Sequence, residues 1–338
     1  MTFDNNFNLL RVIGATFVII SHSYDVTNSI ESEPLLMITN GHLSFSAIGL
    51  YIFFFISGLL VTKSAIFSNN WRSFFAKRAL RIYPALIAVV LLSTFVIGPL
   101  FSKLSTEAYF SSYKTWDYLI TSSGFRIKYL LPGLFESSHQ KSTNASLWTI
   151  SLELKLYFLL GLFTILNVFR NKGFYSILCL FLIAICLGTF FIDSSKMAPT
   201  LQPTSMKLIT MFFIGSFFAV KQIRGKFLLL ASLAGLTLFI LKTSNVYRLP
   251  LPLGELLLFS SLTYFIGYQA PILKIRNDIS YGLYLIAFPI QQVVFLLSGL
   301  QQNALINMII ALLISMIYAL GSWHFIEKPS LVLKGKFK

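Results

Sequence analysis

The sequence predicts an all-α fold, a polytopic bundle of about ten transmembrane helices with both termini in the cytoplasm. Three observations predict it: 56% of the 338 residues are hydrophobic, only 12% are charged, and the mean hydropathy is +0.74. Soluble chains carry about 25% charged residues, and about 20 apolar residues of helix cross the hydrocarbon core of a bilayer. Apolar runs of that length recur along this chain, so an ordinary soluble domain is excluded.

Ten apolar segments are expected to span the membrane and to form a single domain, residues 1–338, with no soluble appendage. They are residues 7–24, 46–64, 85–101, 146–169, 174–192, 206–220, 227–241, 253–268, 279–300 and 304–326. The first eight residues hold no lysine or arginine, and no small-residue cleavage pattern follows the first segment. We therefore expect that segment to be retained as a helix and not removed as a signal peptide.

The basic residues predict the orientation. With the N-terminus inside, seventeen lysines and arginines lie in cytoplasmic segments, whereas the short outer loops hold only Lys196, Lys207, Lys242 and Arg248. The long outer segment 102–145 carries five more, but long loops cross the membrane largely regardless of charge. The positive-inside rule thus places both termini in the cytoplasm, and it explains the net charge of +15 without a nucleic-acid partner.

The first helix carries two basic side chains, Arg11 and His22, eleven positions apart. At about 100° and 1.5 Å per residue, they lie within about 20° on one face and roughly 16 Å apart along the axis. Charged groups inside spans cost about 2.5 kcal/mol or more, which marks them as functional candidates. The alternative is that Arg11 anchors the inner edge and His22 reaches the outer edge.

The approach to the third span holds Lys77, Arg78 and Arg81, shortly before Pro84. Arg78 and Arg81 are three positions apart, so on a helix they share a face and can bind one anionic group with forked donors. A phosphate-bearing cytoplasmic ligand fits this pattern. An ordinary positive-inside cluster is the alternative.

The fourth segment places Glu153 about two turns inside the helix. A carboxylate at that depth needs a partner or a proton. It can pair with Lys155 or take part in a functional site, and the sequence leaves both open. The later segments carry no comparable histidine or arginine.

Several chemistries lack their sequence patterns. No GxSxG, HExxH or glycine-rich phosphate loop occurs, which disfavours hydrolase, metalloprotease and NTPase functions. Cys179 and Cys186 lie in one apolar run, and the histidines are scattered, so neither a metal site nor a disulfide framework is expected. The imidazole of His22, well within a span, is a candidate general base because its ordinary pKa is near neutral.

Six segments, taken in order, resemble the acyltransferase-3 family of bacterial integral-membrane O-acyltransferases. They are NFNLLRVIGATFVIISHS, GLYIFFFISGLLVTKS, FFAKRALRIYP, SLWTISLELKLYFLL, ISYGLYLIAFPI and FIEKPS. Each segment alone is a weak signal, but their order and spacing together are specific. The resemblance runs from about Asn5 to Pro329.

The resemblance implies a multi-pass protein of the bacterial cytoplasmic (inner) membrane that transfers an acyl group, usually acetyl, from acetyl-CoA to a carbohydrate hydroxyl. By the same resemblance, His22 is the family's essential histidine and Arg11 is its partner. Arg78 and Arg81 are the paired arginines, and Glu153 is the fourth-helix carboxylate. Many relatives have a histidine after Tyr-Leu-Ile in the ninth helix, where this chain has Ala287.

These residues suggest a mechanism in which His22 is the general base toward the acceptor hydroxyl. Arg78 and Arg81, with Lys77, would hold the nucleotide phosphates of the acyl-CoA donor. Glu153 would orient the acceptor or the imidazole. Arg11 would hold the pantetheine arm or the charged end of the donor. An acyl-imidazole intermediate on His22 is the competing route.

Two other classes of protein are alternatives to an enzyme. A transporter or lipid-linked glycan flippase could use Arg11, His22 and Glu153 as a relay, but these charges crowd into the first half, without the matched repeats that many transporters show. A scaffold for polysaccharide export would leave the pairing of Arg11 with His22 on one face unexplained.

The acceptor is left open among O-antigen, exopolysaccharide and lipid-linked saccharide. Four aromatic residues of the long outer segment could stack on sugars or form an interfacial belt. They are Tyr109, Tyr113, Trp116 and Tyr118.

Overall fold

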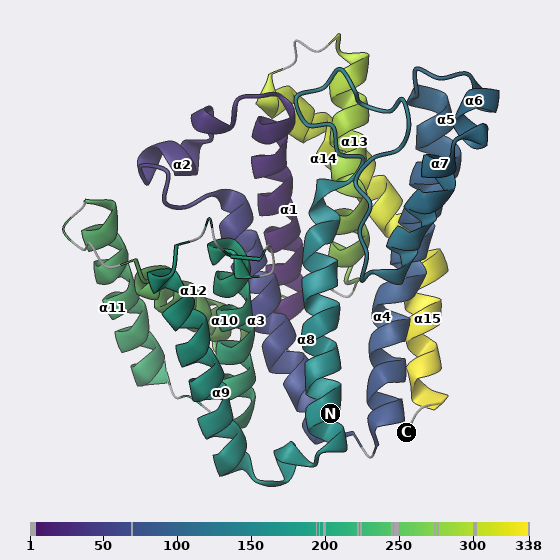
Figure 1. Ribbon diagram of the computed structural model, residues 1–338. Helices are drawn as coiled ribbons and strands as arrows, with labels where there is room; N and C mark the ends of the chain where they lie inside the picture. Colours follow the sequence, from purple (N-terminus) through teal and green to yellow (C-terminus); the bar gives the residue numbers. More distant parts are fainter. Residues whose placement is uncertain are drawn as a thin grey trace. The chain divides into compact units, whose positions relative to one another are not determined.

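The computed structural model is all-helical and confirms the predicted fold class (Figure 1). It describes residues 5–336 except 69, 194, 196, 199–200, 222, 224, 245, 247–249, 274, 276 and 300–302. In this described part no strand occurs, and nine helices are long and apolar enough to cross a membrane. A tenth apolar helix, α12 (Leu253–Tyr268), is shorter. The cytoplasmic location of both termini stays a prediction.

The apolar helices correspond in order to the ten expected segments. They are α1 (Phe7–Val26), α3 (Phe45–Ile66), α4 (Trp71–Leu92) continued by a π-helical turn into α5 (Gly98–Phe101), α8 (Trp148–Ile165), α9 (Lys172–Gly188), α10 (Pro203–Val220), α11 (Gly225–Thr243), α12 (Leu253–Tyr268), α13 (Ser280–Leu297) and α14 (Ala304–Ser322). The expected ninth segment ended at Leu300, which lies outside the described residues. Short helices α2 (Pro34–Ile38), α6 (Thr106–Ser111) and α7 (Tyr113–Asp117) lie in the connections between them.

Two helices extend beyond the runs of apolar residues that predicted them. The helix that contains the expected segment 85–101 begins at Trp71, because the basic turns before it are helical and Pro84 lies inside α4 without ending it. Proline removes one backbone donor, and membrane helices tolerate that loss. At the other end of the chain, α14 continues through a π-helical segment (Trp323–Glu327) into α15 (Lys328–Val332). Lys77, Arg78 and Arg81 therefore lie on turns of α4, and Glu327 lies on a π-helical turn.

The chain divides into two compact units, each discontinuous in sequence. Unit 1 comprises Met1–Gly14, Ala47–Phe75 and Leu156–Arg276, and unit 2 comprises Ala15–Ser46, Ala76–Lys155 and Asn277–Lys338. The two units are described separately below. The single domain expected from the sequence stays a prediction.

In unit 1, α3 and α10 cross with their backbones in contact. A Cβ atom on Gly58 would lie 1.9 Å from the carbonyl oxygen of Phe212, and one on Gly215 would lie 2.1 Å from the carbonyl oxygen of Phe55. Small residues at such crossings allow the close approach that stabilises helix pairs in membranes. Gly58, which the sequence showed only as part of an apolar run, is thus required by packing.

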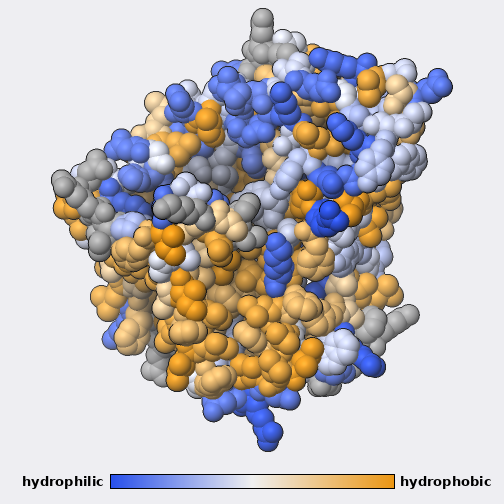
Figure 2. All heavy atoms as spheres, viewed as in Figure 1, coloured by the Kyte–Doolittle hydropathy of each residue, from blue (hydrophilic) through white to orange (hydrophobic). Residues whose placement is uncertain are grey.

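The outer face of α9 in unit 1 is apolar. Five of its large hydrophobic side chains are exposed: Phe174, Ile177, Leu180, Phe181 and Ile185. Figure 2 shows hydrophobic side chains gathered over this helix. An exposed apolar face of this extent fits contact with lipid.

Candidate active site

The imidazole of His22 packs against α13 within unit 2. Its ring meets the ring of Phe288 edge to face, with centroids 5.0 Å apart and an interplanar angle of 89°. One turn further along α13, the side-chain amide of Gln291 donates to the carbonyl oxygen of Ile19 at 2.7 Å and to the hydroxyl of Ser23 at 2.6 Å. These contacts fix one face of α1 against one face of α13. They direct the half-buried His22 ring toward protein.

The same helix α13 holds the start of α8. The Tyr284 hydroxyl lies 2.6 Å from the Thr149 hydroxyl and donates to the carbonyl oxygen of Ser146 at 2.8 Å. Glu153 lies one turn after Thr149 on the same face of α8, and its carboxylate interacts electrostatically with Tyr284. Tyr284 and Phe288 are one turn apart, about 6 Å along the axis. The helices that carry His22 and Glu153 therefore meet adjacent turns of α13.

The loop before α8 is also fixed to α13 and reaches a carboxylate near the histidine. The side-chain amide of Gln292 donates to the carbonyl oxygens of Gln140 and Ser142, the latter at 3.0 Å. The amide of Gln140 in turn donates to the Asp25 carboxylate at 3.1 Å. Asp25 lies one turn after His22 and interacts electrostatically with its imidazole. Asp25 was not among the predicted site residues.

A buried carboxylate organises the connection between α1 and α3. Glu33 accepts hydrogen bonds from the backbone N–H of Phe45 at 2.6 Å and from the Ser21 hydroxyl at 3.0 Å. The same hydroxyl oxygen accepts from the backbone N–H of Ser46 at 2.7 Å. Burial raises the pKa of Glu33, and the two hydrogen bonds partly oppose this shift. Ser21 directly precedes His22, so this connection also holds the helix turn that carries the histidine.

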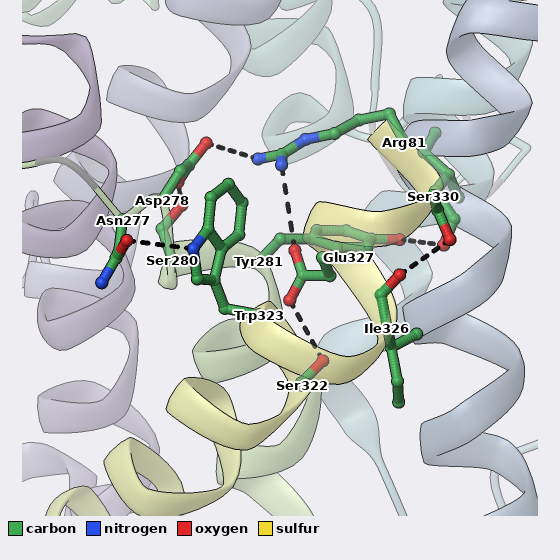
Figure 3. A network of polar contacts seen from close by, with 11 residues as sticks. Arg81, Asn277, Asp278, Ser280, Tyr281, Ser322, Trp323, Ile326, Glu327 and Ser330 are labelled. Atoms are coloured by element: carbon green, nitrogen blue, oxygen red, sulfur yellow. Dashed lines mark hydrogen bonds and ion pairs between the residues drawn. The ribbon is translucent and has the colours of Figure 1, made fainter. Parts of the chain in front are cut away.

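Arg81 lies at the centre of a buried ionic network in unit 2 (Figure 3). Its guanidinium is 2.6 Å from the Asp278 carboxylate and 3.8 Å from the Glu327 carboxylate. Asp278 also accepts from the Ser280 hydroxyl at 2.5 Å, and Glu327 accepts from the Ser322 hydroxyl at 3.1 Å. Arg81 thus joins α4 to the start of α13 and to the π-helical segment after α14.

Neighbouring groups close this network. The indole N–H of Trp323 donates to the side-chain oxygen of Asn277 at 3.1 Å, and the Tyr281 ring centroid lies 5.6 Å from the Arg81 guanidinium carbon. A Cβ on Gly282 would lie 2.9 Å from a Glu327 carboxylate oxygen. The ISYGLY and FIEKP segments, far apart in the sequence, thus both contribute residues to this network. Asp278 and Glu327 were not predicted as site residues, although the position of each carboxylate beside an apolar segment is a signal that the sequence contains.

Five of the six predicted site residues lie in unit 2, whereas Arg11 belongs to the part of α1 in unit 1. Lys77 and Arg78 are half-buried on α4, with Arg78 one turn before Arg81. In unit 2, the helices that carry His22 and Glu153 thus both contact α13. The guanidinium of Arg81 is paired with the carboxylates of Asp278 and Glu327. Among the residues that the structure describes, no group of three or more His, Cys, Asp or Glu side chains could hold a metal ion.

The sequence of the chain matches a known family of proteins. Residues 4–324 match the family described as an acyltransferase domain, and the chain belongs to this acyltransferase-3 family. The chain is thus an acyltransferase with multiple membrane-spanning helices. Membership of this family supports an enzyme and not the transporter that was the alternative from the sequence.

Two similar proteins cover nearly the whole chain. An "O-acetyl transferase" of Shigella phage Sf6 is 30% identical over 96% of this chain and 95% of its own length. "Nodulation protein 10" of Rhizobium leguminosarum bv. viciae is 29% identical over 98% of this chain and 94% of its own length. No solved structure matches the chain.

Proposed function

We propose that this acyltransferase moves an acetyl or other short acyl group from cytoplasmic acyl-CoA to a hydroxyl of a cell-surface or lipid-linked carbohydrate at the bacterial inner membrane. The observation that supports it most is the placement of His22 against α13, in the unit that also carries Glu153 and Arg78. The similar O-acetyl transferase of phage Sf6 supports acetyl as the group.

In the proposed reaction, the His22 imidazole takes the proton of the acceptor hydroxyl while that oxygen attacks the thioester carbonyl. The C–S bond then breaks, coenzyme A leaves as the thiolate, and the imidazolium returns the proton to it. Glu153, one turn from the Tyr284 contact, orients the acceptor or the imidazole. An acyl group carried transiently on His22 is the alternative route.

The donor phosphates are proposed to bind at the basic turns of α4. Lys77 and Arg78 supply positive charge there, and Arg11 on α1 is proposed to contact the donor's pantetheine arm or charged end. The Arg81 charge is compensated by Asp278 and Glu327. We therefore assign Arg81 the task of positioning α4, with any contribution to phosphate binding secondary.

The test is transfer of labelled acetyl from acetyl-CoA in membrane vesicles by the His22→Ala variant. Loss of a general base costs about 10²–10⁴-fold in rate, while coenzyme A binding should persist. His42→Ala, in the connection between α1 and α3, is the matched control. If His22→Ala keeps most of its transfer, the assignment is wrong.

A second measurement separates the two chemical routes. Protein mixed with labelled acetyl-CoA alone and rapidly quenched should carry no label if transfer is direct. Label that is retained by the wild-type protein and absent from His22→Ala would establish the acyl-imidazole route instead.

A further inference from the structure

Unit 1 contains a charged cluster of its own. Glu255 on α12 is 1% exposed and accepts a hydrogen bond from the Tyr51 hydroxyl of α3 at 2.6 Å. The same carboxylate oxygen accepts from Lys207 of α10 at 2.8 Å. The ammonium of Lys242 on α11 lies 3.6 Å from the other carboxylate oxygen. Four helices each supply one side chain.

The cluster carries more positive than negative charge. Two ammonium groups share one carboxylate, and both lysine side chains are largely covered, at 22% and 17% exposed. In the described part of the chain, Glu255 is the only acidic ion-pair partner of Lys207 and of Lys242. The contact from Lys242 is longer than a hydrogen bond, and the oxygen that it faces, Oε1, has no hydrogen-bond donor among the described residues. A charge held this way within apolar helices calls for a further anion.

The position of the cluster indicates where that anion lies. Lys207 is the fifth residue of α10, Glu255 is the third of α12, and Lys242 is the last but one of α11. The beginnings of α10 and α12 contribute the positive ends of two helix dipoles. Positive-inside counting places this end on the side opposite the basic loops, at the depth of lipid headgroups.

The other end of the same helices differs. There Lys63 of α3 donates to a phenol, the Tyr268 hydroxyl at 2.6 Å, and its ammonium lies 4.6 Å from the centroid of that ring. Tyr268 is about 20 Å along α12 from Glu255. The paired lysines thus distinguish one membrane face of unit 1 from the other.

We propose that Lys207 and Lys242 form a binding site for the phosphate of an anionic membrane lipid. Glu255 and Tyr51 hold the two ammonium groups apart and leave one net positive charge for the phosphate oxygens. If the proposed function holds, this site anchors a lipid-linked saccharide acceptor. That last identification rests on the proposed function, whereas phosphate binding does not.

The experiment uses the full chain in phosphatidylcholine vesicles with a photoactivatable polyprenyl phosphate and no acyl donor. Labelling should be displaced by unlabelled polyprenyl phosphate and not by polyprenol or by inorganic phosphate. Lys242→Gln should weaken apparent affinity about tenfold or more, as expected for loss of one charged hydrogen bond. It should fold, because Lys207 still neutralises Glu255.

Matched variants make the result specific. Lys63→Gln, at the opposite end, should label like the wild type, and Glu255→Gln should bind more tightly because the net charge rises. Equal displacement by polyprenol, displacement by inorganic phosphate, or wild-type labelling of Lys242→Gln would overturn the proposal. Because His22→Ala should still be labelled, a failed transfer assay and a failed binding assay remain distinguishable.

Discussion

Replacing Arg81 with alanine tests whether the network around it holds unit 2 together. The substitution leaves the Asp278 and Glu327 carboxylates buried, at 6% and 3% exposed, without the guanidinium. Each carboxylate still accepts a hydrogen bond from a serine hydroxyl (Figure 3), but that neutral donor does not replace the lost positive charge. The expected result is a marked loss of stability, with a loss of transfer that follows from it.

The magnitude follows from burial and geometry. Removing one partner of a buried ion pair costs about 3–5 kcal/mol, because the remaining charge is uncompensated. The Arg81 side chain is 16% exposed, so solvent screening reduces this only slightly. The Asp278 contact at 2.6 Å is a full hydrogen bond, whereas the Glu327 contact at 3.8 Å is not. We therefore expect about 3 kcal/mol, arising mainly from Asp278.

The assay is thermal and detergent-induced unfolding of the purified protein in micelles. Arg78→Ala, one turn earlier on α4, is the control and should unfold near the wild type while its affinity for coenzyme A falls. Arg81→Lys should be intermediate, because it keeps the charge and loses the forked geometry. The double variant Arg81→Ala with Asp278→Ala should lose less than the sum of the single changes. Wild-type unfolding of Arg81→Ala together with weakened donor binding would refute this reasoning.

Three further substitutions test other parts of the fold. Gly58→Ala should lower the melting temperature, because its Cβ would lie 1.9 Å from the backbone of Phe212; Gly188→Ala, with no atom within 4 Å, is its control. Burial raises the pKa of Glu33 in the folded protein above its pKa in the unfolded chain. Protonation of Glu33 therefore stabilises the fold at a pH below the unfolded-state pKa, and this stabilisation is lost as the pH rises through the folded-state pKa. The melting temperature of the wild type should therefore rise relative to that of Glu33→Gln as the pH falls from about 7.5 to about 4.5. A difference in melting temperature that does not change with pH would contradict this. Ala287→His should destabilise by about 1–3 kcal/mol through overpacking, because the position is 3% exposed; unchanged melting with faster transfer would show that an imidazole fits.

The helices were predictable because the signal that defines them is local. A run of about 20 apolar residues specifies a spanning helix whatever its neighbours are, and the segment 253–268 coincides with α12. The start of α4 was not predictable in the same way, because hydropathy falls where Arg78 and Arg81 begin although the backbone stays helical. Charged residues and proline mark the end of the apolar run, whereas the helix itself continues beyond them.

The candidate site residues were found by the cost of burying charge, which is also a local property. Their partners were not found, because pairing depends on topology: Asp278 lies 197 positions from Arg81 in the sequence. A search for isolated charges finds Arg81 and suggests an external phosphate. Only the fold supplies the internal carboxylate that changes the role proposed for it.

Neutral polar residues on α13 carry much of the positioning in unit 2, and a search for charges passes over them. Gln291 fixes α1, Tyr284 fixes the start of α8, and Gln292 fixes the loop that precedes α8. Amides and phenols make such contacts without the several kcal/mol that an uncompensated ion would cost in an apolar bundle. An enzyme that needs an imidazole and a carboxylate at a set separation can therefore keep both ionisable groups on other helices and hold them through a third. In this arrangement α13 supplies the contacts, with an alanine at position 287, and the proposed base, His22, lies on α1.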